Sequence, residues 1–444
     1  MRGSRSALVV LAALACSGEP AATDGGLDGG IDAGRDAARA DAARRDVGLD
    51  ASPPVDSSTD PEWVRIEGSP DDCYMEYALH PERVTRVEWL PCSAGLPSSC
   101  THAVFEPPLQ LRPSGRTGLW DWSRGRGLFI GKNGSGAGGT STIALMSSDG
   151  VALVALHAVE PSTVACPGEL AMATDTVSVL SDYFNPPVGL PRPIRVFRGP
   201  FDAWFAAPLP VGELATIPRL ASVQDMLTSA TVTVHQIVPR GYLLISRDGE
   251  PSNHTLPGGA TPRAVIGDDV FWATDGSAGT RIFHSGSNDA DDLVIDGVAR
   301  GESFDSFATD GTTMVWTPAL LAPDGRTLLG YAVMTAPYAT TAADLVARRL
   351  PVDLPTTATS VRLGPGVVAY AWFDRPTSQG HLEVMQLSDG SRSRLTLPNA
   401  PVAWAPTDMV AWVTDDEVAV PAHSSADRTP TMLRIARSAF VPVP

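Results

Sequence analysis

Ile266-Gly-Asp-Asp-Val-Phe-Trp272 is the stretch on which the fold prediction depends, because it joins a tight turn to an apolar run that ends in an aromatic residue. Gly and Asp favour the turn, and Val, Phe and Trp favour an extended strand. The pattern recurs at Thr309-Asp-Gly-Thr-Thr-Met-Val-Trp316, Leu363-Gly-Pro-Gly-Val-Val-Ala-Tyr370 and Ala405-Pro-Thr-Asp-Met-Val-Ala-Trp412, with weaker equivalents at 127–130, 176–180 and 230–234. The aromatic residues are 44, 54 and 42 positions apart, so the chain contains an internal repeat.

A second recurring element follows the first in several units, and in it Asp-Gly separates two strand-like runs. It occurs at 145–150, 244–249 and 385–390. Asp-Gly favours a tight hairpin because both of its residues tolerate positive φ. Each unit is therefore predicted to contain strand, turn, strand, hairpin and strand. Val211–Leu220 and Thr340–Arg349 come nearest to a helical pattern, and both are short.

Four short strands per repeat at this period are typical of a β-propeller. We predict an all-β body at 61–444 that contains seven four-stranded blades after residue 114. Residues 61–113 either form an eighth blade or supply the strand that closes the ring. A pair of β-sandwiches is the alternative fold.

One unit also resembles a known family. Asp269-Val-Phe-Trp-Ala-Thr-Asp-Gly276 resembles the motif of YWTD-type propellers, and the rhythm of residues 115–444 resembles TolB-type propellers. Both resemblances imply the same propeller fold for the body.

Residues 1–15 have the pattern of an export signal. Arg2 and Arg5 precede the apolar run 7–14, which is shorter than the roughly 20 residues that a membrane span needs. Ala12-Ala13-Leu14-Ala15-Cys16 resembles the bacterial lipobox, although Ala13 stands where Leu is commonest. The resemblance implies cleavage before Cys16 and lipidation of its thiol. Ser17, and not Asp, follows the cysteine, which by analogy with enteric sorting rules favours an outer-membrane or cell-surface location. A plain secretory signal with a chance cysteine is the alternative.

Residues 16–60 are predicted to be a disordered tether behind the lipidated cysteine. Ten acidic residues and seven glycines lie between Ser17 and Asp60, with few large apolar side chains. Such a segment buries too little apolar surface to offset the entropy lost on ordering. The lipid on Cys16 is the only membrane attachment that we predict.

The other four cysteines are disulfide candidates: Cys73, Cys92, Cys100 and Cys166. An even number in an exported chain favours disulfides, and three pairings are open. We prefer Cys92 with Cys100, since a short flexible loop separates them, and Cys73 with Cys166.

The sequence predicts no catalytic, cofactor or metal site. The glycine-rich stretch 131–139 lacks the spacing of a phosphate loop, and none of the eight histidines forms a pair at metal-binding spacing. Asn288-Asp-Ala-Asp-Asp292 is better explained as a solvated turn than as a calcium site. The repeated Trp and Tyr residues fit packing between blades better than carbohydrate stacking, and Trp120 and Trp122 are better candidates for exposed aromatic residues.

The formal net charge of −17 disfavours nucleic acids and anionic lipid surfaces as partners. We therefore expect an envelope-anchored, monomeric, non-catalytic binding or scaffold module with a protein or glycan ligand. Two alternatives stay open: a secreted glycan hydrolase or lyase with dispersed carboxylates, and a structural envelope component.

Overall fold

The computed structural model describes the chain in segments, within one compact unit that extends from Ser58 to Pro444. The signal segment, Cys16 and the tether up to residue 60 lie outside the described residues. The described residues are 62–65, 75–79, 86–92, 95–106, 120–123, 126–133, 140–146, 153–159, 169–172, 176–181, 192–200, 211–217, 222–238, 242–247, 254–255, 259–276, 279–285, 293–298, 307–359, 361–398, 404–406, 410, 412–424 and 430–443.

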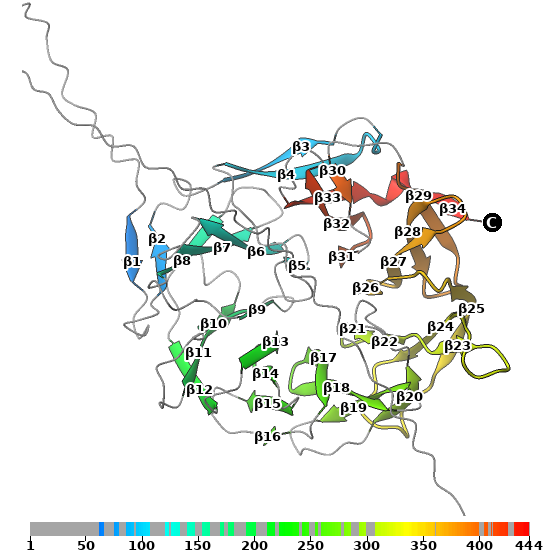
Figure 1. Cartoon of the computed structure of the whole chain (residues 1–444), viewed down its shortest axis with the longest axis horizontal. Coiled ribbons are helices and arrows are strands. Elements are labelled where there is room, and N and C mark those ends of the chain that lie inside the picture. The colour runs from blue at the N-terminus through cyan, green and yellow to red at the C-terminus, as the bar shows by residue number, and fades with distance from the viewer. Residues whose placement is uncertain are drawn as a thin grey trace, which may run out of the picture. The chain divides into compact units, whose positions relative to one another are not determined.

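These residues form seven antiparallel sheets that succeed one another along the chain (Figure 1). The first sheet contains β5 (Trp120–Ser123), β6 (Arg126–Asn133), β7 (Thr140–Met146) and β8 (Leu153–Val159). The second contains β9 (Glu169–Met172), β10 (Thr176–Ser181), β11 (Arg192–Pro200) and β12 (Val211–Ile217). The third contains β13 (Ser222–Thr228), β14 (Val232–Val238), β15 (Tyr242–Arg247) and β16 (His254–Thr255).

The later sheets follow the same plan with small additions. The fourth contains β17 (Ala260–Ile266), β18 (Asp269–Gly276), β19 (Gly279–Ser285) and β20 (Val294–Val298). The fifth contains β21 (Phe307–Thr309), β22 (Thr313–Trp316), β23 (Ala319–Leu321), β24 (Leu328–Pro337) and β25 (Arg348–Leu354). The sixth contains β26 (Arg362–Gly364), β27 (Val367–Asp374), β28 (Gln379–Gln386) and β29 (Arg392–Thr396). The seventh contains β30 (Trp404–Pro406), β31 (Trp412–Val413), β32 (Glu417–Ser424) and β33 (Pro430–Ala436).

Residues near the two ends of the described chain add strands to these sheets. β1 (Trp63–Arg65) and β2 (Met75–Ala78) extend the first sheet, because β2 pairs with β8. β3 (Arg86–Pro91) and β4 (Cys100–Glu106) extend the seventh, because β4 pairs with β33, so blue strands lie beside red ones in Figure 1. β34 (Val441–Val443) pairs with β29 in the sixth sheet. The described part of 61–113 thus joins the first and last sheets and forms no sheet of its own.

The sheets contact one another in chain order through their first strands. β9 contacts β5 and β13, β17 contacts β13 and β21, and β26 contacts β21 and β31. Neighbouring turns are also linked, since the Ser229 hydroxyl donates a hydrogen bond to the Gly267 carbonyl at 2.6 Å. Each of these first strands is thereby held against the next.

The predicted turn-and-aromatic repeat corresponds to the second strand of successive sheets. Trp272, Trp316 and Tyr370 are each the fourth residue of that strand, and each is buried, with 2%, 4% and 0% of its surface exposed. The motif at 269–276 forms the whole of β18. For these three residues, the expectation that repeated aromatic side chains pack in the core is confirmed.

The prediction was wrong for Trp412, which lies in the strand before the turn of its sheet and not after it. The turn falls at 414–417, where the Thr414 hydroxyl accepts a hydrogen bond from the Glu417 amide at 3.0 Å. The fourth residue of β32 is Val420. Two turn signals lie close together in this unit, and the pairing of β31 with β32 selects the second.

The other local predictions were corrected in two places. Val211–Ile217 is a strand, and Thr340–Arg349 is a turn region that leads into β25, so neither is a helix. The loop between β28 and β29 comprises residues 387–391, and a 2.9 Å hydrogen bond from the Gln386 amide to the Ser391 carbonyl closes it. Only its Gly390 has positive φ, as expected of a loop longer than two residues, in which Asp389 need not adopt that conformation.

The one helix among the described residues is the short 3-10 helix η3 (Arg437–Ala439). No helix in the described part has the length and apolar character that a membrane span requires.

The core lies between neighbouring sheets. The side chains of β27 alternate, so that Val367, Ala369 and Ala371 pack with Val418 and Leu433 of the seventh sheet. Val368 and Tyr370, on the opposite face, pack with Val333 and Leu350 of the fifth sheet. The sixth sheet therefore has apolar side chains on both faces, which explains the runs of apolar residues in β27 and β28.

We predict that Gly364→Ala destabilises the protein by about 1–3 kcal/mol, the usual range for an overpacked core. A Cβ atom there would lie 2.4 Å from the Val413 carbonyl oxygen, where β26 meets β31. Gly380→Ala is the control, because its Cβ would meet only the flexible Leu397 side chain at 3.3 Å. Urea unfolding of both variants tests the prediction, and equal losses would contradict it.

Candidate functional site

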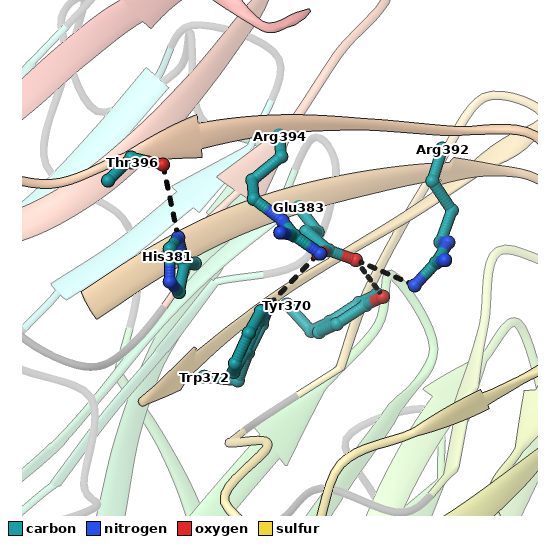
Figure 2. Close-up of polar contacts among 7 residues, drawn as sticks. All are labelled: Tyr370, Trp372, His381, Glu383, Arg392, Arg394 and Thr396. Atoms are coloured by element: carbon teal, nitrogen blue, oxygen red, sulfur yellow. Dashed lines mark hydrogen bonds and ion pairs between the residues drawn. The ribbon is translucent and has the colours of Figure 1, made fainter. Parts of the chain in front are cut away.

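A buried carboxylate lies on the face of the sixth sheet that packs against the fifth. Glu383 in β28 is directly opposite Tyr370 in β27 and Arg394 in β29, and its side chain is 1% exposed. Cross-strand pairing thus places these three side chains together on one face. Figure 2 shows Glu383 at the centre of this group, which we call the Glu383 cluster.

The Glu383 carboxylate is surrounded by donors. Its Oε1 accepts hydrogen bonds from Arg394 Nε at 2.6 Å and from Trp372 Nε1 at 3.1 Å. Its Oε2 accepts a hydrogen bond from the Tyr370 hydroxyl and lies 3.5 Å from Arg392 Nη1. Burial raises the pKa of the Tyr370 phenol, and the negative charge of Glu383 raises it further, so the hydroxyl stays protonated and donates.

A stack of flat side chains covers one side of the cluster. The Arg394 guanidinium carbon lies 5.0 Å from the Trp372 ring centre, and the His381 ring stacks on Trp372 at 4.3 Å. His381 Nδ1 is 3.2 Å from the Thr396 hydroxyl, and burial together with Arg394 lowers the pKa of the imidazole. Trp372 therefore contacts two protein side chains, which disfavours its use as a platform for a sugar.

The chemistry of this cluster is that of a link between strands. Both carboxylate oxygens are engaged by donors, and two arginines balance the charge. A carboxylate with its lone pairs engaged in this way is a poor nucleophile or general base. The cluster instead holds three strands of the sixth sheet in register where they meet the fifth.

A second polar cluster joins the fourth and fifth sheets. Asp269, at the start of β18, has its Oδ1 2.8 Å from His284 Nε2 and accepts a 2.5 Å hydrogen bond at Oδ2 from the Tyr338 hydroxyl. Tyr338 follows β24, so this bond crosses between sheets. Burial raises the pKa of Tyr338, as does its bond to Asp269. The Phe271 ring packs against both His284 and Tyr338, at 5.3 and 5.9 Å.

A third polar layer lies between the second and third sheets. The Ser178 and Thr228 hydroxyls are 2.8 Å apart, and Arg198 donates to the Thr233 hydroxyl at 3.2 Å. His235, two residues from Thr233 on the same face of β14, is fully buried, and neither ring nitrogen has a hydrogen-bond partner among the described residues. Burial lowers the pKa of His235 to about 3, so the imidazole is neutral at physiological pH.

Sequence reasoning missed the Glu383 and Asp269 clusters, because it had no means of choosing among 50 acidic residues. A signal was present in β28 and β29. Glu383 interrupts an apolar run, and Arg392 and Arg394 alternate in the next strand. His284 and His381 lie in packed positions, with exposed fractions of 4% and 6%.

Of the five cysteines that the sequence singled out, two lie within the described residues. Cys92 and Cys100 form a disulfide across the β3–β4 hairpin, as the short loop predicts, with an S–S distance of 2.02 Å. Cys16, Cys73 and Cys166 lie outside the described residues, as does the acidic loop 288–292. Trp120 and Trp122 lie in β5, but their side chains are not among the described ones.

No group of three or more His, Cys, Asp or Glu side chains that could hold a metal ion is found among the described residues.

Comparison with known proteins gives a likeness of fold alone. No family model matches the chain, and no curated protein matches it. Among solved structures, the chain is similar to the β-propeller domain of the trilobed protease from Pyrococcus furiosus, with 8% identity, a TM-score of 0.44, and coverage of 76% of this chain and 95% of that domain. It is also similar to prolyl oligopeptidase B from Galerina marginata, with 9% identity, a TM-score of 0.40, and coverage of 77% of this chain and 55% of that one. At these identities no activity follows for this chain.

We predict that Glu383→Gln lowers the free energy of unfolding by about 2–3 kcal/mol, because two arginines lose their buried counter-charge. Asp353→Asn is the control, since its ion pair with Arg349 is about half exposed and water screens it. Chemical denaturation at neutral pH measures both changes. A loss for Glu383→Gln no larger than that of the control would show that the cluster does not hold the sheet together.

We predict that His235 makes stability depend on pH. Between a pKa of about 3 when folded and about 6.5 when unfolded, only the unfolded chain binds the proton, so the stability that His235 contributes is complete above about pH 6.5 and falls as the pH drops towards 3. The free energy of unfolding of the wild type should fall, relative to that of His235→Phe, by roughly 1 kcal/mol per pH unit below about pH 6.5. Urea unfolding of both proteins at about pH 7.5 and about pH 5.5 measures this difference. A difference that is independent of pH would refute the role of His235.

Proposed function

We propose that this protein is an envelope-anchored, non-catalytic binding or scaffold module whose body is a seven-bladed β-propeller. In this proposal the seven sheets are the blades, and the first strand of each blade lies innermost. The finer likeness to YWTD-type or TolB-type propellers rests on the stretch 269–276 and on the rhythm of the repeats.

The pairing of β4 with β33 is the observation that carries the proposal. It places a strand from the beginning of the body in the same sheet as strands from its end. Together with the contacts between successive first strands, this pairing supports a closed body. A closed propeller is a stable platform whose loops and central opening are available to ligands.

The internal chemistry of the body supports the same function. The Glu383 and Asp269 clusters join strands or sheets through contacts with protein groups. Such contacts favour a fixed platform that presents a surface to a partner. The partner class that we propose is an envelope protein or an envelope glycan, bound by a monomer.

The anchor is the second part of the proposal and rests on the lipobox-like stretch Ala12–Cys16. Lipidation of Cys16 would attach the chain to the outer membrane or cell surface, and the acidic tether at 16–60 would separate the body from the lipid. Each buried CH₂ of an acyl chain contributes about 0.8 kcal/mol to membrane attachment, so a multiply acylated cysteine would hold the chain firmly.

We predict that the wild-type chain, expressed in a bacterium with a lipoprotein pathway, incorporates radioactive palmitate and partitions into detergent. Cys16→Ser should lose both properties, because serine has no thiol to lipidate, whereas Cys73→Ser should retain them. Equal labelling of wild type and Cys16→Ser would contradict the proposal that Cys16 is lipidated.

Capture from solubilised envelope extract tests the binding function. The purified chain should retain a protein or glycan saturably, and excess free chain should compete for it. Absence of any saturable partner, or turnover on a panel of polysaccharides that is lost on substitution of one Asp or Glu, would overturn the proposed function.

A further inference from the structure

Arg263 occupies an unusual position in the innermost strand of the fourth sheet. Pro262 pairs with Trp272 and Ala264 pairs with Phe271, so Arg263 is the extra residue of a β-bulge. β13 has a register shift at the corresponding position, between Gln224 and Met226. Bulges redirect the side chain that they carry and are frequent beside binding sites.

The bulge lies at a junction of three sheets. β17 is the edge strand of its sheet, and it contacts β13 on one side and β21 on the other. The backbone of β17 is also held from β13's sheet, since Gln236 Nε2 donates to the Ala260 carbonyl at 3.3 Å. Arg263 is therefore carried by a strand that is fixed on both sides.

The Arg263 side chain is partly buried and unpaired. Its Nε atom is buried and has no hydrogen-bond partner, and no hydrogen bond, ion pair or ring contact of its guanidinium occurs within the described part of the chain. The other described arginines that are partly buried all have polar partners: Arg198, Arg362, Arg392, Arg394, Arg434 and Arg437. Among the partly buried arginines of the described residues, Arg263 is thus the exception.

An unpaired buried donor destabilises a folded protein and calls for an explanation. A guanidinium has five N–H donors and no acceptor, so only an acceptor group can pair with Arg263. A carboxylate would relieve the destabilisation, because its two oxygens match two parallel N–H groups of the guanidinium.

We propose that Arg263 anchors a binding site for a small carboxylate where β13, β17 and β21 meet. The net charge of −17 repels a ligand with one negative charge less than it repels a multiply charged anion. This assignment deepens the binding function proposed above and rests on it, since it names the chemical group of the ligand that the body recognises.

Sodium acetate is the probe, and sodium chloride at equal ionic strength is the reference. Acetate should raise the Tm of the full-length chain saturably, because a ligand that binds only the folded state stabilises it. In a sample labelled with ¹⁵N-arginine, acetate should also shift one Nε–H resonance that is missing from the spectrum of Arg263→Lys. Sodium phosphate should have a weaker effect than acetate.

Variants separate the site from general charge effects. Arg263→Gln should abolish the response to acetate, and its Tm in chloride should equal or exceed that of the wild type because the unpaired group is gone. Arg281→Gln is the matched control, since it removes an exposed arginine that pairs with Asp296 in the same sheet, and its response to acetate should be unchanged.

The proposal is overturned if the wild type shows no saturable response to acetate, if Arg263→Gln responds equally, or if phosphate binds as tightly as acetate. If Arg263→Gln does not fold, the Nε–H resonance of the wild type still tests the site, because acetate must shift it if Arg263 binds the carboxylate. Capture of an envelope partner equally by wild type and Arg263→Gln would overturn this site but leave the binding function standing. Failure of the wild type to capture any partner would overturn the binding function itself.

Discussion

The pairing of β4 with β33 is the constraint on which the rest of the body depends. His102 lies opposite Leu433, and the Thr431 hydroxyl donates a 2.5 Å hydrogen bond to the Ala103 carbonyl across a separation of 328 residues. Cys100, whose disulfide closes the β3–β4 hairpin, lies opposite Ile435 in the same ladder and packs in the core of the seventh sheet. Without this pairing, β33 would have an unpaired edge, which is a site for association with other chains.

The polar groups between the sheets differ from one interface to the next, whereas the apolar groups are similar. The fifth and sixth sheets enclose Glu383 with two arginines, and the fourth and fifth share Asp269 with Tyr338. The second and third share a layer of hydroxyls with Arg198. Repeated sheets that are apolar on both faces could pack in several orders. Asp269 accepts a hydrogen bond from Tyr338 of the fifth sheet, so it favours the native order of the fourth and fifth sheets, since another neighbour would not supply that donor.

The sequence predicts the repeat and its period well, because strand propensity and turn chemistry act over a few residues. Ile266–Trp272 shows this, with Gly267 at positive φ in the turn and Trp272 in the core. The prediction of the repeat fails at Trp412, because two turn signals lie close together there and only the pairing of β31 with β32 distinguishes them. The roles of Glu383 and Arg263 could not be predicted from short stretches of sequence, for a related reason. The partners of Glu383 come from two other strands, and the isolation of Arg263 is a property of the assembled sheets.

The long-range ladder also determines the order in which the body can assemble. The β3–β4 hairpin is local, and its disulfide joins residues only eight positions apart, so it can form as soon as that segment is free to fold. Its partner strand is synthesised more than 300 residues later. Until then the β4 edge is unpaired, and it requires either rapid completion of the chain or a chaperone that covers exposed strand edges. A disulfide that stiffens the waiting hairpin would limit its pairing with the wrong strand during that interval.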